Sequence, residues 1–253
     1  MTDGDREHRY SEGQGFGEPY EGFDIDPEEL TVDLDPTKVD PVDSHVLPDL
    51  LDEGTLPKEA VDAEDLLEVG VAYVGIERFE QATETFERAA RFAADDRIAQ
   101  EAWVNKGAAH AELAAVSESS ETEEWDAAIG AYLEAIHIDD DSEHAATAEN
   151  NLAYAYWESG EDSKALEHAE RAIEIDERFA EAWFNRAYFL NERGLAEQAL
   201  ESVENAIRLG FKAAPVLEEK VKALEELGEY DRAEEAAEEA ERLREQAEEG
   251  LVG

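Results

Sequence analysis

A repeat of 34 residues is the sequence feature that most constrains how this chain can fold. Glycines recur at this step, and so do the alanines five residues after them: Gly160, Gly194 and Gly228, then Ala165, Ala199 and Ala233. A fixed period of this length is typical of solenoids, in which each unit packs only on its neighbours. We therefore predict a stack of similar units rather than one layered globular core.

The composition of the repeating region indicates that each unit is helical. No proline occurs between Pro57 and Pro215, and Ala, Glu, Leu and Arg dominate this stretch, which leaves no obvious place for a β-strand. Short helical segments are separated by four glycines that we interpret as hairpin turns: Gly75, Gly160, Gly194 and Gly228. The expected fold class is all-α, built from antiparallel helical hairpins.

The packing positions of the units follow a recognisable pattern. Residues 63–96 supply Leu66, Gly70 and Tyr73 and then Ala82 and Phe86, and residues 180–213 supply Trp183, Ala187 and Leu190 and then Ala199 and Val203. This pattern resembles the tetratricopeptide repeat, in which small residues on both helices let the two backbones approach. Five units fit it, at about 63–96, 100–142, 146–179, 180–213 and 214–247, within a repeat domain of residues 58–253.

The resemblance implies a right-handed α-solenoid that binds a protein or peptide in a concave groove lined by the first helices of successive hairpins. The sequence departs from the family pattern in two ways. The proline that ends the unit is missing from most repeats, where Asp140 and Phe211 are examples of its replacements, and the second unit carries an insertion. We expect the inserted residues, Val116 to Glu124, to form a surface loop, with Ser120 to Glu123 as a capping box for a helix that starts near Trp125.

Projecting the family's groove positions onto this chain gives a surface of aromatic and amide side chains. The predicted partner-binding residues are Asn105, Asn150, Asn151, Tyr154, Trp157, Phe184, Asn185, Tyr188 and Asn191. Aromatic side chains are frequent in binding hot spots, and Asn amides can pair with a peptide backbone. The alternative is that residues such as Tyr154 and Phe184 pack between hairpins. Some family members clamp a C-terminal carboxylate with cations at positions that are Val104, Asn150 and Phe184 here, so that specificity is not expected.

Residues 1–57 differ in composition from the repeats. They contain six of the 7 prolines and many Asp and Gly, and we interpret them as a largely disordered acidic tail. Within the tail, residues 42–51 carry Val42, Val46 and Leu50 at helical spacing. This segment is either an isolated apolar patch or an anchor that lies in the protein's own groove and regulates it.

The net charge of -47, from 68 acidic and 21 basic residues, excludes the basic footprint that nucleic acid or anionic membranes need. The acid is spread over the whole chain, and this distribution resembles proteins of salt-accumulating halophiles such as halophilic archaea. We therefore interpret the charge mainly as an adaptation to high salt. The rival interpretation is an acidic, chaperone-like binder of basic proteins.

No motif for chemistry is found. The chain has 0 cysteines, its six histidines lack the spacing of a metal site, and no Gly-rich phosphate loop occurs, so we expect neither an enzyme nor a cofactor or metal site. No stretch is long and apolar enough for a membrane span, and the first ten residues do not resemble a signal peptide. The expected location is the cytoplasm, and the sequence does not fix the oligomeric state.

Overall fold

The structure is a computed structural model that describes residues 61–116 and 121–252, all within one compact unit that spans Leu34–Gly253. The described residues form helices and turns without a β-strand. The helices are α2 (Ala63–Gly75), α3 (Phe79–Phe92), α4 (Asp96–Val116), α5 (Glu121–Ile138), α6 (Glu143–Glu158), α7 (Asp162–Ile175), α8 (Ala180–Glu192), α9 (Ala196–Arg208), α10 (Ala214–Glu226) and α11 (Tyr230–Val252). The predicted tail, 1–57, and its segment 42–51 lie outside the described residues.

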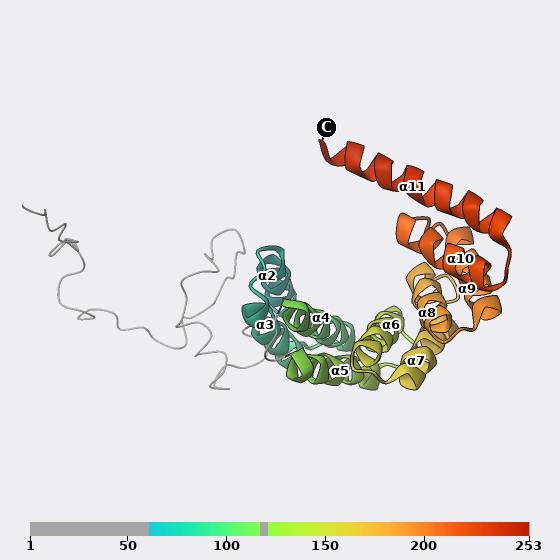
Figure 1. The fold of residues 1–253 in the computed structure, drawn as a ribbon. Helices are drawn as coiled ribbons and strands as arrows, with labels where there is room; N and C mark the ends of the chain where they lie inside the picture. The colour runs from blue at the N-terminus through green and yellow to red at the C-terminus, as the bar shows by residue number, and fades with distance from the viewer. Residues whose placement is uncertain (1–60, 117–120, 253) are drawn as a thin grey trace, which may run out of the picture. The chain divides into compact units, whose positions relative to one another are not determined.

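The helices pair into five successive hairpins, α2–α3, α4–α5, α6–α7, α8–α9 and α10–α11 (Figure 1). Each hairpin also packs on the next, and the first helices contact one another directly in the series α2, α4, α6, α8 and α10. This arrangement confirms the predicted all-α fold of stacked hairpins. It also places the first helices side by side, so residues at one register position of successive first helices are neighbours on one surface, which we call the first-helix face.

The hairpin turns depend on a residue in the left-handed backbone region. Gly160, Gly194 and Gly228 all have positive φ, between 68° and 77°, as the repeat predicts. In the third hairpin the turn is closed by the Glu161 N–H, which donates to the Tyr156 carbonyl over 2.8 Å. Such a bond satisfies a carbonyl at the helix end that would otherwise lack a partner.

The first hairpin makes the same turn without glycine. The Arg78 N–H donates to the Tyr73 carbonyl over 2.9 Å, and Glu77 takes the left-handed conformation with φ 59°. The prediction that Gly75 makes this turn is wrong, because Gly75 is the last residue of α2. Glu77 occupies the register of the other turn glycines, and a non-glycine residue there carries backbone strain.

The contact between the two helices of a hairpin depends on a small residue in the first helix. Cβ atoms added at Gly70 and Gly107 would lie 2.4 Å from the rings of Phe86 and Tyr132, so glycine is required for these rings to pack on the helix backbone. In the fourth hairpin the equivalent residues are Ala187 and Val203, both buried in one core cluster. A larger residue on the first helix thus accompanies a smaller one on the second.

The insertion in the second hairpin lengthens its helices, contrary to the prediction of a loop from Val116 to Glu124. Helix α4 continues to Val116 and α5 already begins at Glu121, four residues before Trp125. The sequence Glu-Thr-Glu-Glu places acidic residues in the first turn of a helix, where they interact favourably with the helix dipole. The capping residue that we predicted, Ser120, lies outside the described residues.

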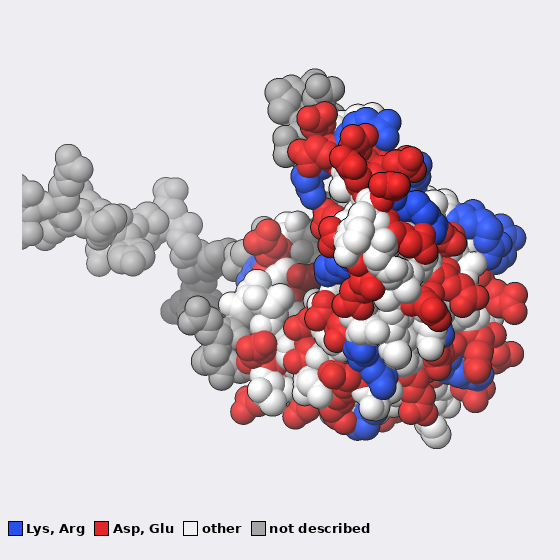
Figure 2. Space-filling model, turned by 45° about the vertical axis from the view of Figure 1, so that its right-hand side comes forward, with Lys and Arg blue, Asp and Glu red and all other residues white. Residues whose placement is uncertain are grey.

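On the face shown in Figure 2, acidic side chains are widespread and basic ones are fewer. Many of the cations in the described ranges form ion pairs, such as Arg97 with Glu101 at 3.0 Å and Arg171 with Glu174 at 3.2 Å. Exposed pairs of this kind contribute little to stability, typically less than about 1 kcal/mol each. None of the helices over 61–116 and 121–252 combines the length and the apolar character needed to cross a membrane.

Candidate functional site

Three of the predicted asparagines on α6 and α8 form a connected row on the first-helix face. The Asn185 side-chain amide donates to Asn150 Oδ1 over 2.9 Å, and the Asn150 amide donates to Asn151 Oδ1 over 3.3 Å. Asn151 in turn hydrogen-bonds the Tyr132 hydroxyl of α5. This hydrogen bond lowers the pKa of the hydroxyl, but burial has the larger effect and raises it. Because Asn150 is only 7% exposed, these amides mainly connect neighbouring hairpins. Asn105 is half-buried on α4.

Two further predicted residues lie at the contact between α8 and the hairpin that follows. Phe184 packs edge-on against Phe211, with ring centroids 5.6 Å apart. Asn191 is buried and its amide donates both to the Glu219 backbone carbonyl, over 2.9 Å, and to Glu219 Oε2, over 2.8 Å. Asn191 therefore links the fourth and fifth hairpins, whereas Phe184 packs against the segment that joins α9 to α10.

The three remaining predicted residues, Tyr154, Trp157 and Tyr188, form an aromatic cluster across α6 and α8. Trp157 contacts Tyr188 edge-on at 5.5 Å between centroids and stacks on buried Phe189 at 5.1 Å. Tyr154 packs edge-on against Trp125 at 5.9 Å, yet it is 44% exposed. The aromatic cluster is thus anchored in the core by Trp157 and open to solvent at Tyr154.

Carboxylates accompany this cluster, and they were missed in the sequence. Glu158, one turn after Tyr154 on α6, hydrogen-bonds the Tyr154 hydroxyl. Partial burial, then the charge of Glu158 and this hydrogen bond, raise the pKa of Tyr154 to about 12. The last turns of the first helices carry glutamate at one register position in four hairpins: Glu112, Glu158, Glu192 and Glu226. In a chain with acid everywhere, only their register distinguishes these four: Glu158, Glu192 and Glu226 follow the 34-residue step, and Glu112 holds the same place in the longer second hairpin.

In the fifth hairpin a cation, Lys222, holds the register position that Tyr154 and Tyr188 hold in the third and fourth. Lys222 of α10 places its Nζ 5.6 Å from the ring centroid of Tyr188, 3.8 Å from Glu192 and 2.8 Å from Glu219. The hydrogen bond to Glu219 is the main cause that raises the pKa of Lys222. An ammonium group held between a tyrosine ring and carboxylates is favourable because the ring face and the carboxylates are both negative.

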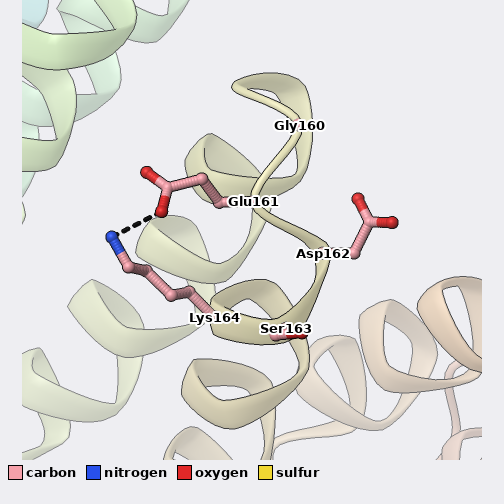
Figure 3. A pocket seen from close by; sticks show the side chains of 5 residues that line it. All are labelled: Gly160, Glu161, Asp162, Ser163 and Lys164. Atoms are coloured by element: carbon pink, nitrogen blue, oxygen red, sulfur yellow. Dashed lines mark ion pairs between the residues drawn. The ribbon is translucent and has the colours of Figure 1, made fainter.

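Two hollows of the described surface lie at hairpin turns. One of about 390 Å³ is lined by Gly160 to Lys164, where Lys164 forms an ion pair with Glu161 at 2.5 Å (Figure 3). Its walls come from five consecutive residues at a turn, and its cation is already paired. Such an open hollow offers few convergent groups to a small ligand.

The described residues contain no cluster of three or more metal-ligating side chains. The buried carboxylate Glu149 lies 2.6 Å from His168 Nδ1, and the imidazole stacks on Tyr156 with centroids 5.1 Å apart. This pair joins the two helices of the third hairpin rather than opening onto the first-helix face.

Two profiles described as tetratricopeptide repeat match the sequence, over residues 147–179 and 168–201. The matched residues cover the third hairpin and the first part of the fourth. This segment of the chain therefore matches the tetratricopeptide repeat, in agreement with the resemblance in the packing positions. A comparison with curated proteins gave no match.

Solved structures of similar fold include those of MamA, BtubC and YrrB. A MamA protein has a TM-score of 0.56 and 18% identity over 74% of this chain and 94% of its own. BtubC from P. vanneervenii has a TM-score of 0.61 and 15% identity, over 73% of this chain and 80% of its own. YrrB, described as a tetratricopeptide repeat protein with an unusual peptide-binding site, has a TM-score of 0.52 and 16% identity, over 78% of this chain and 92% of its own. At these identities the likeness establishes the fold alone.

Proposed function

We propose that this chain is a protein-interaction adaptor that binds an extended peptide segment of a partner on its first-helix face. The observation that carries the proposal is the aromatic cluster, in which rigid rings anchored in the core end in the exposed Tyr154. Large aromatic groups with few rotatable bonds give much contact area at little entropic cost, and they dominate the energetics of many interfaces. Binding alone needs no catalytic group and no cofactor.

The comparisons support this proposal at the level of fold. Tetratricopeptide repeats are known as modules of protein–protein interaction, and YrrB is itself described as having a peptide-binding site. The packing contacts narrow the predicted set of partner-binding residues. Among the nine, we expect Tyr154, Trp157, Tyr188 and Asn105 to contact the partner, with Asn151 and Asn185 at the edge. Asn150, Phe184 and Asn191 are expected to act through the packing of the hairpins.

The test uses peptides selected from a random display library on the full-length chain and measured by fluorescence anisotropy. Tyr154→Ala should weaken them by about fivefold or more, or ~1 kcal/mol, which is the usual threshold of a hot-spot residue. Tyr230→Ala is the matched control, because Tyr230 is 69% exposed at the start of α11 and lies outside the aromatic cluster. Equal affinities for the two variants would exclude this surface as the binding site.

We propose further that the acidic surface is an adaptation of the chain to a cytoplasm of high salt. At 1 M salt the Debye length falls to about 3 Å, so repulsion among exposed carboxylates is largely screened. Helical circular dichroism recorded from zero to multimolar KCl should rise cooperatively with salt. A chain that is already fully helical in dilute buffer would contradict salt adaptation and favour the acidic, chaperone-like binder of basic proteins.

The alternative, in which the chain is regulated by its own tail, has a separate test. If residues 42–51 bind the first-helix face, deletion of residues 1–57 removes a competitor held at high effective concentration and raises peptide affinity. The motivation is the apolar spacing of Val42, Val46 and Leu50 in an otherwise polar segment. Unchanged affinity after the deletion would show that the tail does not compete.

A further inference from the structure

The first-helix face repeats one small constellation in two hairpins. Tyr154 and Glu158 on α6 have the same spacing and register as Tyr188 and Glu192 on α8. In each pair the glutamate lies one helical turn after the tyrosine, so ring and carboxylate lie on one face of the helix. The two pairs therefore offer the same chemistry to whatever covers them.

The two pairs differ in what covers them. Lys222, from the equivalent position of the next first helix, holds its ammonium over Tyr188 and beside Glu192. For the earlier pair, Tyr154 and Glu158, the equivalent position on the next first helix is Tyr188, which is uncharged. Among the described residues no lysine or arginine forms an ion pair with Glu158.

Building on the proposed function, we infer that the partner is a basic peptide that places a lysine or arginine side chain over Tyr154, with Glu158 as its counter-charge. The peptide thereby supplies in the third hairpin the cation that Lys222 supplies in the fourth. Ring face and carboxylate together attract a cation more strongly than either alone, and Tyr154 is open enough to receive one. The other exposed members of the glutamate row, Glu112 and Glu226, extend the preference for basic residues along the face.

Charge also argues against the other available occupants. The tail segment 42–51 carries Asp43 and Asp49 and no lysine or arginine, so it brings carboxylates toward Glu158. A second copy of the chain, with a net charge of -47, is repelled in the same way. An acidic C-terminal peptide is disfavoured for the same reason. A basic extended peptide is the occupant that complements the face.

The composition of the library-selected peptides tests the inference separately from the proposed function. Peptides that depend on Tyr154 and are enriched in Lys or Arg support both. Peptides that depend on Tyr154 without such enrichment leave the adaptor function standing and overturn the basic partner. If no selected peptide depends on Tyr154, the proposed function fails and the inference fails with it.

A matched pair of charge-neutral substitutions then locates the contact. Glu158→Gln should weaken a selected basic peptide about fivefold or more, since a hydrogen-bonded charge pair is lost. Glu167→Gln removes one exposed carboxylate from the second helix of the same hairpin and should change the affinity less than about twofold, as for an exposed charge outside the contact. Equal losses would mean that the peptide senses only the overall charge, which would overturn the assigned site.

Replacing the peptide's cation completes the test as a double-mutant cycle. Each lysine or arginine of the peptide is changed to glutamine and measured against wild type and Glu158→Gln at low and at 1 M KCl. One peptide position should couple to Glu158, so that its loss costs little once Glu158 is gone. Additive losses at every position would contradict a specific pair, and circular dichroism of each protein variant checks that the fold is retained.

Discussion

The second and the fourth hairpins are built on the same register but use their aromatic residues differently. In the second, Tyr132 fills the space between the two helices, and Gly107 is needed to make room for its ring. In the fourth, the pair at this register is Ala187 and Val203, and the tyrosine of the hairpin, Tyr188, lies on the first-helix face instead. A repeat can therefore keep its fold while aromatic surface moves from the core to a position where it can bind.

The strongest test of this comparison is Gly107→Ala. The added Cβ would lie 2.4 Å from the Tyr132 ring, which is 2% exposed and cannot move away. Overpacking of a core usually costs about 1–3 kcal/mol, and the better helix propensity of alanine offsets part of this. We expect a net loss of about 1–2 kcal/mol in the free energy of unfolding, measured by urea denaturation at constant salt.

Gly130→Ala is the control, because Gly130 lies in the same hairpin with open space around it. It should be neutral or stabilise the chain by up to about 1 kcal/mol. The double variant Gly107→Ala/Tyr132→Val imitates the pair of the fourth hairpin and should recover part of the loss. If the effects of the two substitutions on the free energy of unfolding are simply additive, the size of the residue at 107 does not depend on the size of the residue at 132. The second and fourth hairpins would then not be packed in the same way.

A second contrast concerns the first position of the unit, which is Gln100 in the second hairpin and alanine in the others. The buried Gln100 amide donates to the carbonyls of Ala135, over 3.0 Å, and Asp139, over 2.6 Å, and its oxygen accepts from the Ser142 hydroxyl over 2.8 Å. It thereby fixes the end of α5 and the start of α6 to α4.

Gln100→Ala should destabilise the chain by about 1–3 kcal/mol, because buried polar groups lose their partners. The exposed Gln198→Ala on α9 is the control and should change stability by less than about 0.5 kcal/mol. Thermal unfolding followed by circular dichroism would compare the two. A loss no larger than that of the control would indicate that water replaces the amide without cost.

The turns provide a smaller contrast between the first hairpin and the later ones. Glu77→Gly should stabilise the chain by up to about 1 kcal/mol, since glycine adopts the left-handed conformation without strain. Gly160→Ala, at the same register of the third hairpin, should destabilise it by about the same amount. Stability changes of the same sign would show that the two turns are not equivalent.

The repeat period was sufficient to predict the hairpins and the turns at Gly160, Gly194 and Gly228, because these features recur in the sequence. Features that occur only once in the sequence were harder to predict. The helix from Glu121 was missed because the acidic insertion was interpreted as a loop, and Glu77 was missed because a glycine stood two residues before it. Charged loops and the first turns of helices have similar compositions.

The candidate site was predicted only in part for a related reason. A register position identifies which side of a helix a residue occupies, but it does not distinguish an exposed residue from one buried against the next helix. Asn150 and Asn191 have the spacing of binding residues and form hydrogen bonds between hairpins instead. Glu158 was hidden by the abundance of acid, and its contact with Tyr154 became evident only in the structure.

The smallest expected effect is on the titration of Tyr154, on the first-helix face of the third hairpin. The pKa of Tyr154 is raised from 10.0 to about 12, first by partial burial and then by Glu158. The raised pKa means that the folded chain holds the phenolic proton more tightly than the unfolded chain. This contribution to stability is complete below pH 10 and is lost as the pH rises toward 12. Absorbance at 295 nm should therefore show a phenol that titrates near pH 12 and disappears in Tyr154→Phe.

Glu158→Gln should move this titration to lower pH because it removes a neighbouring negative charge, whereas Glu167→Gln should leave it in place. The same substitution thus reads the Tyr154–Glu158 contact without any partner present. If Glu158→Gln weakens a basic peptide and also shifts the phenol, ring and carboxylate act as one site. If the phenol does not respond, the two groups are too far apart in solution to hold one cation, and the comparison with Tyr188, Glu192 and Lys222 no longer supports a basic partner.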